Sequence, residues 1–157
     1  MNQEVLSEEN FEAAPMVFDN EMMIDFNSLS KNENFARTVV AAFVSQLNPT
    51  LEEIADIKTA VSEAVTNSII HGYRNSIGKV TIHCGIKERD VFIEIIDHGV
   101  GIEDVEKAME PLFTTCPELE RSGMGFAFMS AFMDDLQVLS KRGLGTTVKM
   151  RKRIGTT

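Results

Sequence analysis

Apolar side chains recur at every second position in several stretches of the chain, and this period predicts β-strands. The clearest stretch is residues 79–86, KVTIHCGI, with apolar or small side chains at Val80, Ile82, Cys84 and Ile86. The charged turn KERD separates it from a second such stretch, residues 90–97, DVFIEIID. The other predicted strands are residues 23–29, 136–140 and 145–153.

Other stretches carry apolar side chains at helical spacing. The first follows Ser30, which we expect to cap it, and it contains Phe35, Val39, Ala42 and Phe43. A second helix is predicted to begin near Leu51, after an Asn-Pro-Thr turn, and a third covers residues 125–135. Residues 98–122 read as a long loop that contains a short helix at 102–109.

The order of these elements is strand, two helices, two strands, a long loop, a helix and two strands. Adjacent strands joined by short turns pair antiparallel, so the helices have to cover one face of the resulting sheet. The sequence therefore predicts an α+β fold, a two-layer sandwich with helices on one face of a mixed, largely antiparallel sheet.

The second helix has one apolar face and one polar face. At about 100° per residue, one third of its circumference collects the apolar side chains of Ile54, Ile57, Val61, Val65 and Ile69. Glu63 and Asn67 lie nearly opposite, one turn apart. These two side chains therefore point to solvent or into a functional site, and the spacing alone leaves both readings open.

Length and composition set the domain organisation. A chain of 157 residues with 43% hydrophobic content suits one domain with a real core. The first residues are acidic, lack a steady period and contain Pro15, so we expect residues 1–21 to form a flexible extension and residues 22–157 a single domain. Cys84 and Cys116 are expected to be free thiols.

The net charge narrows the range of partners. A formal charge of -9 argues against direct nucleic-acid binding, which usually needs a basic surface, and favours a protein or small-molecule partner. No stretch is long and apolar enough for a membrane span, and the N-terminal residues lack the pattern of a signal peptide. We therefore expect a cytoplasmic protein.

Two glycine motifs add candidate chemistry. DHGVGI, residues 97–102, places a carboxylate at a strand end before two glycines, where it can accept a hydrogen bond from an exocyclic amine. SGMGF, residues 122–126, opens the third long helix, where backbone N–H groups and the helix dipole favour anions. Either motif alone is also common as an ordinary turn.

Taken together, EAVTNSIIHG, DHGVGI and SGMGF resemble the N box and the two glycine boxes of the GHKL ATPase superfamily, which has the Bergerat ATP-binding fold. The resemblance implies ATP or ADP as the nucleotide, Asn67 as a Mg²⁺ ligand and Glu63 as a general base. It implies that Asp97 recognises the adenine amine and that Gly99 and Gly101 make room for the base. The residues implied near the phosphates are Thr114, Thr115, Arg121, Ser122, Gly123 and Gly125, with Arg121 neutralising charge on the γ-phosphoryl group.

Within that superfamily, EPLFTTCPELERSGMGFAFM, FMDD and GTT resemble the small anti-sigma serine kinases of sporulation. The resemblance implies a homodimer that holds a sigma factor and phosphorylates an anti-anti-sigma factor on serine. Thr146 either approaches the adenine or is a plain strand residue, and Arg37 either anchors a partner or lies along a helix edge. The alternative functions are a stress-response anti-sigma kinase, a catalytic domain detached from a histidine kinase, and a non-catalytic module that binds sigma with ATP.

Overall fold

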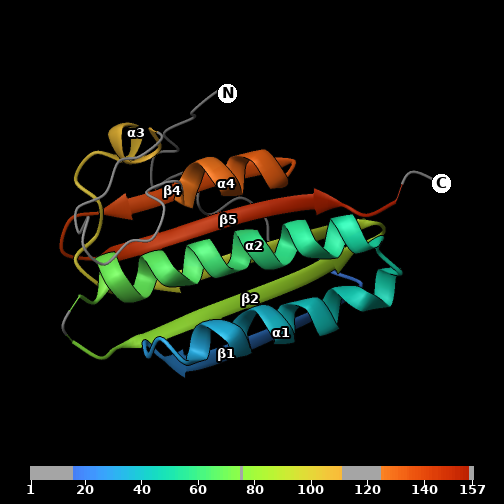
Figure 1. The fold of residues 1–157 in the computed structure, drawn as a ribbon, viewed down its shortest axis with the longest axis horizontal. Helices are drawn as coiled ribbons and strands as arrows, with labels where there is room; N and C mark the ends of the chain where they lie inside the picture. The colour runs from blue at the N-terminus through green and yellow to red at the C-terminus, as the bar shows by residue number, and fades with distance from the viewer. Residues whose placement is uncertain (1–15, 75, 111–124, 156–157) are drawn as a thin grey trace.

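The stretches with a two-residue period pair into one sheet. The computed structural model describes residues 16–74, 76–110 and 125–155. Its strands are β1 (Asn20–Asn27), β2 (Lys79–Lys87), β3 (Asp90–Asp97), β4 (Asp135–Lys141) and β5 (Gly145–Arg153). Their spatial order is β1-β2-β3-β5-β4, and each of these neighbouring pairs is antiparallel (Figure 1).

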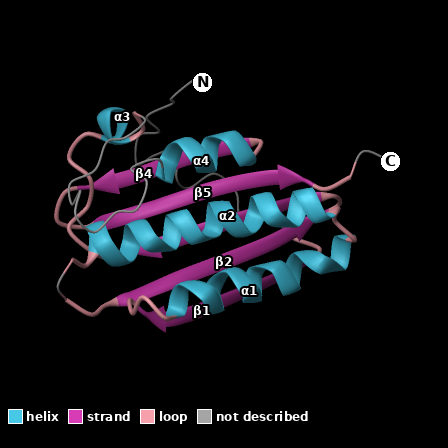
Figure 2. Cartoon of the chain, viewed as in Figure 1, coloured by secondary structure: helices cyan, strands magenta, loops and turns pink. Residues whose placement is uncertain are grey.

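The helices cover one face of this sheet (Figure 2). They are α1 (Asn32–Val44), α2 (Leu51–Asn67), the short α3 (Val105–Ala108) and α4 (Gly125–Phe132), with a 3₁₀ turn at Ser45–Leu47 and a π-helical turn, η3, at Ser68–Gly72. In the described part of the chain, no helix has the length and apolar character needed to cross a membrane. The predicted α+β sandwich is confirmed, and the pairings seen are all antiparallel.

The core lies between the helices and the sheet. Ile57, Val61 and Val65 on α2 are fully buried, as their spacing predicted, and they meet the inward side chains of β2 and β3, such as Ile82 and Ile93. Burial of side chains of this size contributes about 1.5–3 kcal/mol each, which makes this layer the main source of stability.

Cys84 belongs to the same core. It is buried in β2 and forms no disulfide within the described residues. Burial raises the pKa of the Cys84 thiol to about 12, so the thiol stays protonated at neutral pH. Cys116 lies outside the described residues.

Several predicted boundaries are wrong by a few residues. Ser30 does not cap α1: the N-cap is Lys31, without a side-chain hydrogen bond. The last long helix ends at Phe132 instead of residue 135, because the Asp134 N–H donates to the Arg151 carbonyl at 2.9 Å and the chain joins the sheet edge. The first strand begins at Asn20, three residues early, since β2 continues to pair with it.

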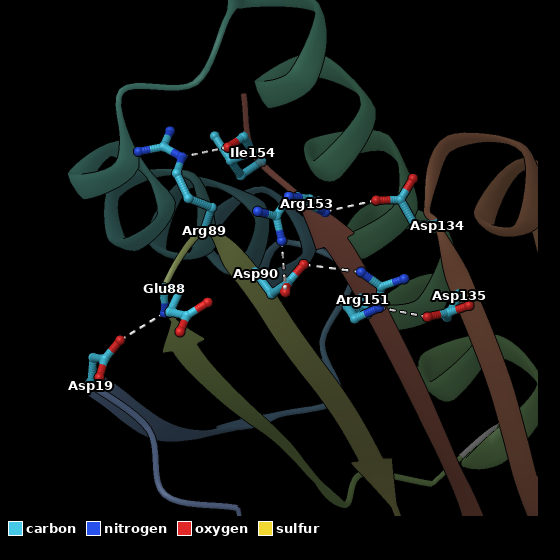
Figure 3. Close-up of polar contacts among 9 residues, drawn as sticks. All are labelled: Asp19, Glu88, Arg89, Asp90, Asp134, Asp135, Arg151, Arg153 and Ile154. Atoms are coloured by element: carbon cyan, nitrogen blue, oxygen red, sulfur yellow. Dashed lines mark hydrogen bonds and ion pairs between the residues drawn. The ribbon is translucent and has the colours of Figure 1, made fainter. Parts of the chain in front are cut away.

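A charged cluster ties together the end of the sheet where β3 begins (Figure 3). Arg151 donates to Asp90 at 2.9 Å and to Asp135 at 2.5 Å, and the Arg153 N–H donates to Asp134 at 2.7 Å. Asp97 ends β3 seven residues after Asp90, which corresponds to about 23 Å of strand. The cluster therefore joins β3, β4 and β5 far from Asp97 and has a structural role.

Candidate functional site

The end of α2 and the start of α4 meet at Gly125. A Cβ atom at Gly125 would lie 3.3 Å from Asn67 Nδ2, 3.5 Å from Asn67 Oδ1 and 3.4 Å from Glu63 Oε2. The polar face of α2 is therefore covered by the helix that begins with the second glycine motif. Two motifs more than fifty residues apart in the sequence thus lie side by side, and a side chain at residue 125 would fill the space next to Glu63 and Asn67.

The amide of Asn67 is not fully hydrogen-bonded within the described residues. Its Nδ2 is buried and has no hydrogen-bond partner within the described part of the chain. The oxygen and nitrogen of an amide are assigned from their partners, so a half-turn of this group places the oxygen at the same point. A buried polar atom without a partner is costly, which favours a site that is completed on binding.

These residues fit Mg²⁺ only together with a phosphate ligand. In the described residues there is no group of three His, Cys, Asp or Glu side chains able to hold a metal. Mg²⁺ commonly keeps few protein ligands and takes its other oxygens from phosphates and water, so one amide oxygen from Asn67 suits it. A single protein oxygen of this kind is compatible with an ion that a nucleotide also binds, and it differs from a dedicated metal cage.

Asp97 is the buried carboxylate of the site. It ends β3, is 4% exposed, and accepts hydrogen bonds from the Gly99 N–H at 2.9 Å, the Ser68 hydroxyl and the Thr146 backbone N–H. Burial raises the pKa of Asp97, and these hydrogen bonds offset part of that shift. A carboxylate held this firmly away from water is suited to accept a further hydrogen bond from a ligand.

The raised pKa of Asp97 gives a pH-dependent stability. Because the folded protein disfavours the ionised form of Asp97, the neutral carboxyl contributes to folding stability. This contribution is fully present below the ordinary pKa of 3.8, and it is lost as the pH rises through the pKa of the folded protein. We expect Asp97→Asn, which cannot ionise, to gain stability relative to the unmodified protein as pH rises. Urea unfolding from pH 4 to pH 8 measures this difference, and a difference that stays constant with pH contradicts it.

The two glycines after Asp97 have a structural reason of their own. A Cβ atom at Gly99 would lie 2.1 Å from the Gly72 carbonyl oxygen, and the Val100 N–H donates to the same oxygen at 2.8 Å. Gly101 has φ of 76°, and a Cβ there would lie 2.3 Å from the Lys141 carbonyl oxygen. The loop is thus packed between η3 and the β4–β5 turn. Proximity of these glycines to a base stays a prediction.

The π-helical turn η3 was not predicted. The Tyr73 N–H donates to the Ser68 carbonyl at 3.0 Å, five residues back, and a Cβ at Gly72 would lie 2.9 Å from Asp97 Oδ1. The turn therefore brings Ser68 and Gly72 against Asp97. Such turns within helices are frequent at functional sites, but no residue pattern in the sequence announces this one.

The remaining predicted residues are only partly placed. Thr146 is directly opposite Asp97 in the β3–β5 register and is 8% exposed, so it joins the same group. Arg37 is half-buried on α1, where its Nε donates to Asn34 Oδ1 at 3.2 Å. Thr114, Thr115, Arg121, Ser122 and Gly123 lie outside the described residues.

Comparison with known proteins agrees with this fold. Residues 27–152 match the family model of the histidine kinase-like ATPase domain, which defines the class. An anti-sigma F factor from Thermoanaerobacter sp. (strain X514) is 62% identical over 141 residues, which cover 90% of this chain and 99% of the relative. An anti-sigma F factor from Caldanaerobacter subterraneus subsp. tengcongensis is 63% identical over 140 residues, which cover 89% of this chain and 98% of the relative. One from Clostridium kluyveri is 59% identical over 136 residues, which cover 87% of this chain and 96% of the relative. The chain belongs to the anti-sigma F factor family of histidine kinase-like ATPases.

Proposed function

We propose that this protein binds and inhibits a sporulation sigma factor and that it uses ATP to phosphorylate a serine of the cognate anti-anti-sigma factor. The name shared by its relatives supports the first activity. The observation that carries the second is the meeting of Glu63, Asn67 and Gly125 at the start of a helix. It places a carboxylate beside an amide whose Nδ2 has no hydrogen-bond partner among the described residues. That arrangement suits an anion and a proton acceptor side by side.

In this mechanism each side chain has one task. Asp97 accepts a hydrogen bond from the adenine amine, and the backbone N–H of Gly125 at the start of α4 faces the phosphates. Glu63 takes the proton from the hydroxyl of the substrate serine while the serine oxygen forms a bond to the γ-phosphorus. The bond between the γ-phosphorus and the β-phosphate oxygen breaks, which releases ADP. Mg²⁺, held by Asn67, would supply charge neutralisation on the phosphates.

The residues outside the described ranges complete the proposal. Arg121 neutralises charge on the transferring group, the Gly123 N–H contacts phosphate, and Thr114, Thr115 and Ser122 contribute hydrogen bonds from a lid. These roles stem from the resemblance to the superfamily. They are supported here by the position of Gly125, which follows them in the chain and lies at the site.

A non-catalytic module that binds sigma with ATP is the second candidate. Glu63 Oε2 and both polar atoms of Asn67 approach the same point beside Gly125, so the carboxylate is also placed to orient the amide. A stress-response kinase and a detached histidine kinase domain receive less support, because the relatives that span most of this chain are named anti-sigma F factors.

A transfer assay separates the two candidates. The purified protein is incubated with γ-labelled ATP, Mg²⁺ and an anti-anti-sigma factor, and the label is located by digestion and mass spectrometry. Label on a serine of the added protein supports the kinase. Bound ATP without any transfer, across several anti-anti-sigma factors, would leave the sigma-binding module as the better account.

The sigma-binding surface is proposed to include Arg37 in a homodimer. The hydrogen bond to Asn34 holds the guanidinium along α1, and planar guanidinium groups are frequent anchors in protein interfaces. We expect Arg37→Ala to weaken sigma binding by about tenfold or more, measured by titration calorimetry, with nucleotide binding retained. Unchanged sigma affinity would reject the anchor role.

A further inference from the structure

A polar row crosses the end of the sheet at the candidate site. Asp97 on β3 is opposite Thr146 on β5, and Thr146 is opposite Ser140 on β4. Residues directly opposite in a sheet project to the same face, so the three side chains stand next to one another. Ser140 has no role in the proposed function so far.

The hydroxyl of Ser140 makes three close contacts. Its oxygen accepts from the Ile102 N–H at 2.7 Å, it donates to the Gly145 carbonyl oxygen at 3.0 Å, and it lies 2.8 Å from Thr146 Oγ1. These contacts join the loop after β3, the β4–β5 turn and the side chain beside Asp97. The two partners in the backbone fix the role of the hydroxyl, since an N–H only donates and a carbonyl only accepts.

Proton counting then sets the direction of the Thr146 hydroxyl. A serine hydroxyl has one proton and two lone pairs, and the Ser140 proton goes to Gly145. All three contacts are hydrogen bonds at once only if Thr146 donates its own proton to Ser140. Thr146 Oγ1 is then left with lone pairs alone for any ligand.

We propose that Ser140 is a positioning residue for nucleotide specificity: it holds Thr146 as a hydrogen-bond acceptor, so that Thr146 and Asp97 together select a purine with an amine at position 6. This rests on the proposed nucleotide binding at this site. Adenine presents a donor at that position, whereas hypoxanthine presents a carbonyl oxygen. The hypoxanthine carbonyl would face the two acceptors Asp97 and Thr146, and these buried oxygen atoms would stay without a hydrogen bond. Binding sites that depend on hydrogen bonds discriminate strongly against such a mismatch.

The test compares ADP with IDP, which differ at position 6 of the base. Titration calorimetry with Mg²⁺ gives both dissociation constants for the unmodified protein and for Ser140→Ala. In the variant the Thr146 hydroxyl is free to turn and donate to the IDP carbonyl, so the preference for ADP over IDP falls by about tenfold, chiefly through tighter IDP binding. A merely structural role for Ser140 would instead weaken both nucleotides to the same degree.

Three further variants sharpen the result. Ser140→Thr keeps the hydroxyl and should keep the preference for ADP over IDP. Thr146→Val removes the acceptor itself and should lower that preference, which provides a test that does not depend on the folding of Ser140→Ala. Thr147→Val deletes a hydroxyl from the next residue, which projects to the opposite face of the sheet, and should change nothing. An unchanged ratio of the two constants in both Ser140→Ala and Thr146→Val overturns the inference, whereas a protein that binds neither nucleotide overturns the proposed function with it.

Discussion

Replacement of Glu63 by glutamine is expected to lower serine phosphorylation of the anti-anti-sigma factor by about 10²–10⁴-fold, the usual contribution of a general base. Glutamine has nearly the same size as glutamate, so the packing against Gly125 is preserved; a Cβ atom at Gly125 would lie 3.4 Å from Glu63 Oε2. It also keeps an acceptor oxygen but has almost no affinity for a proton. Binding of Mg–ATP, measured by calorimetry, should therefore stay within about threefold of the unmodified protein.

A carboxylate at the other end of α2 provides the control. Glu52 is exposed in the first turn of α2, and Glu52→Gln removes the same charge from the same helix away from the site. Its transfer rate should be unchanged. If Glu63→Gln loses ATP binding and transfer in the same proportion, the carboxylate holds Asn67 in place and is not the base. Unaltered transfer would remove Glu63 from the mechanism altogether.

The fold was largely predictable because its layers follow simple periods. Alternate residues of 79–86 and 90–97 are buried in the sheet, and the spacing of Ile57, Val61 and Val65 identified the face of α2 that packs on it. The errors fell at the ends of helices and strands, where a single long-range contact can determine the last residue of the element. The bond from Asp134 to Arg151 that ends the last helix joins residues whose proximity no local pattern reveals.

The site was predictable only as separate motifs. Residue type and spacing made Glu63, Asn67 and Asp97 candidates, and their roles came from the resemblance and stay predictions. Ser140 was missed because its value depends on contacts with Ile102, 38 residues away, and with the paired strand β5. A serine in a strand looks ordinary until its hydrogen-bond partners are known.

The turn η3 was missed for a different reason. At Ser68–Gly72 the backbone hydrogen bonds reach the fifth residue back instead of the fourth, and the period of apolar side chains does not report this change. The contacts of Ser68 and Gly72 with Asp97, on a strand that comes later in the chain, favour the wider turn. The wider turn therefore depends on tertiary contacts with β3, which the local sequence does not reveal.

The second large effect is expected for Asn67→Ala. The variant removes the amide oxygen proposed as the protein ligand of Mg²⁺. Since loss of a residue that only supports a metal ligand typically costs about 10–100-fold, loss of the ligand itself should weaken metal-dependent binding at least as much. The loss should appear in calorimetry with ATP and Mg²⁺ and shrink when EDTA removes the metal. A nucleotide affinity reduced equally with and without Mg²⁺ would assign Asn67 to the phosphates themselves or to packing.

Ser62 is a matched control on the same helix. Its Oγ is, like Asn67 Nδ2, a buried polar atom with no hydrogen-bond partner in the described part of the protein. Only Asn67 lies beside Gly125, whereas Ser62 is not among the nearest atoms to that glycine. Ser62→Ala should therefore leave Mg–ATP binding unchanged and raise the free energy of unfolding by about 1 kcal/mol, because an unsatisfied polar group is removed. If Ser62→Ala loses as much Mg–ATP binding as Asn67→Ala, the loss reflects disturbed packing of α2. The assignment of Asn67 to the nucleotide site then fails.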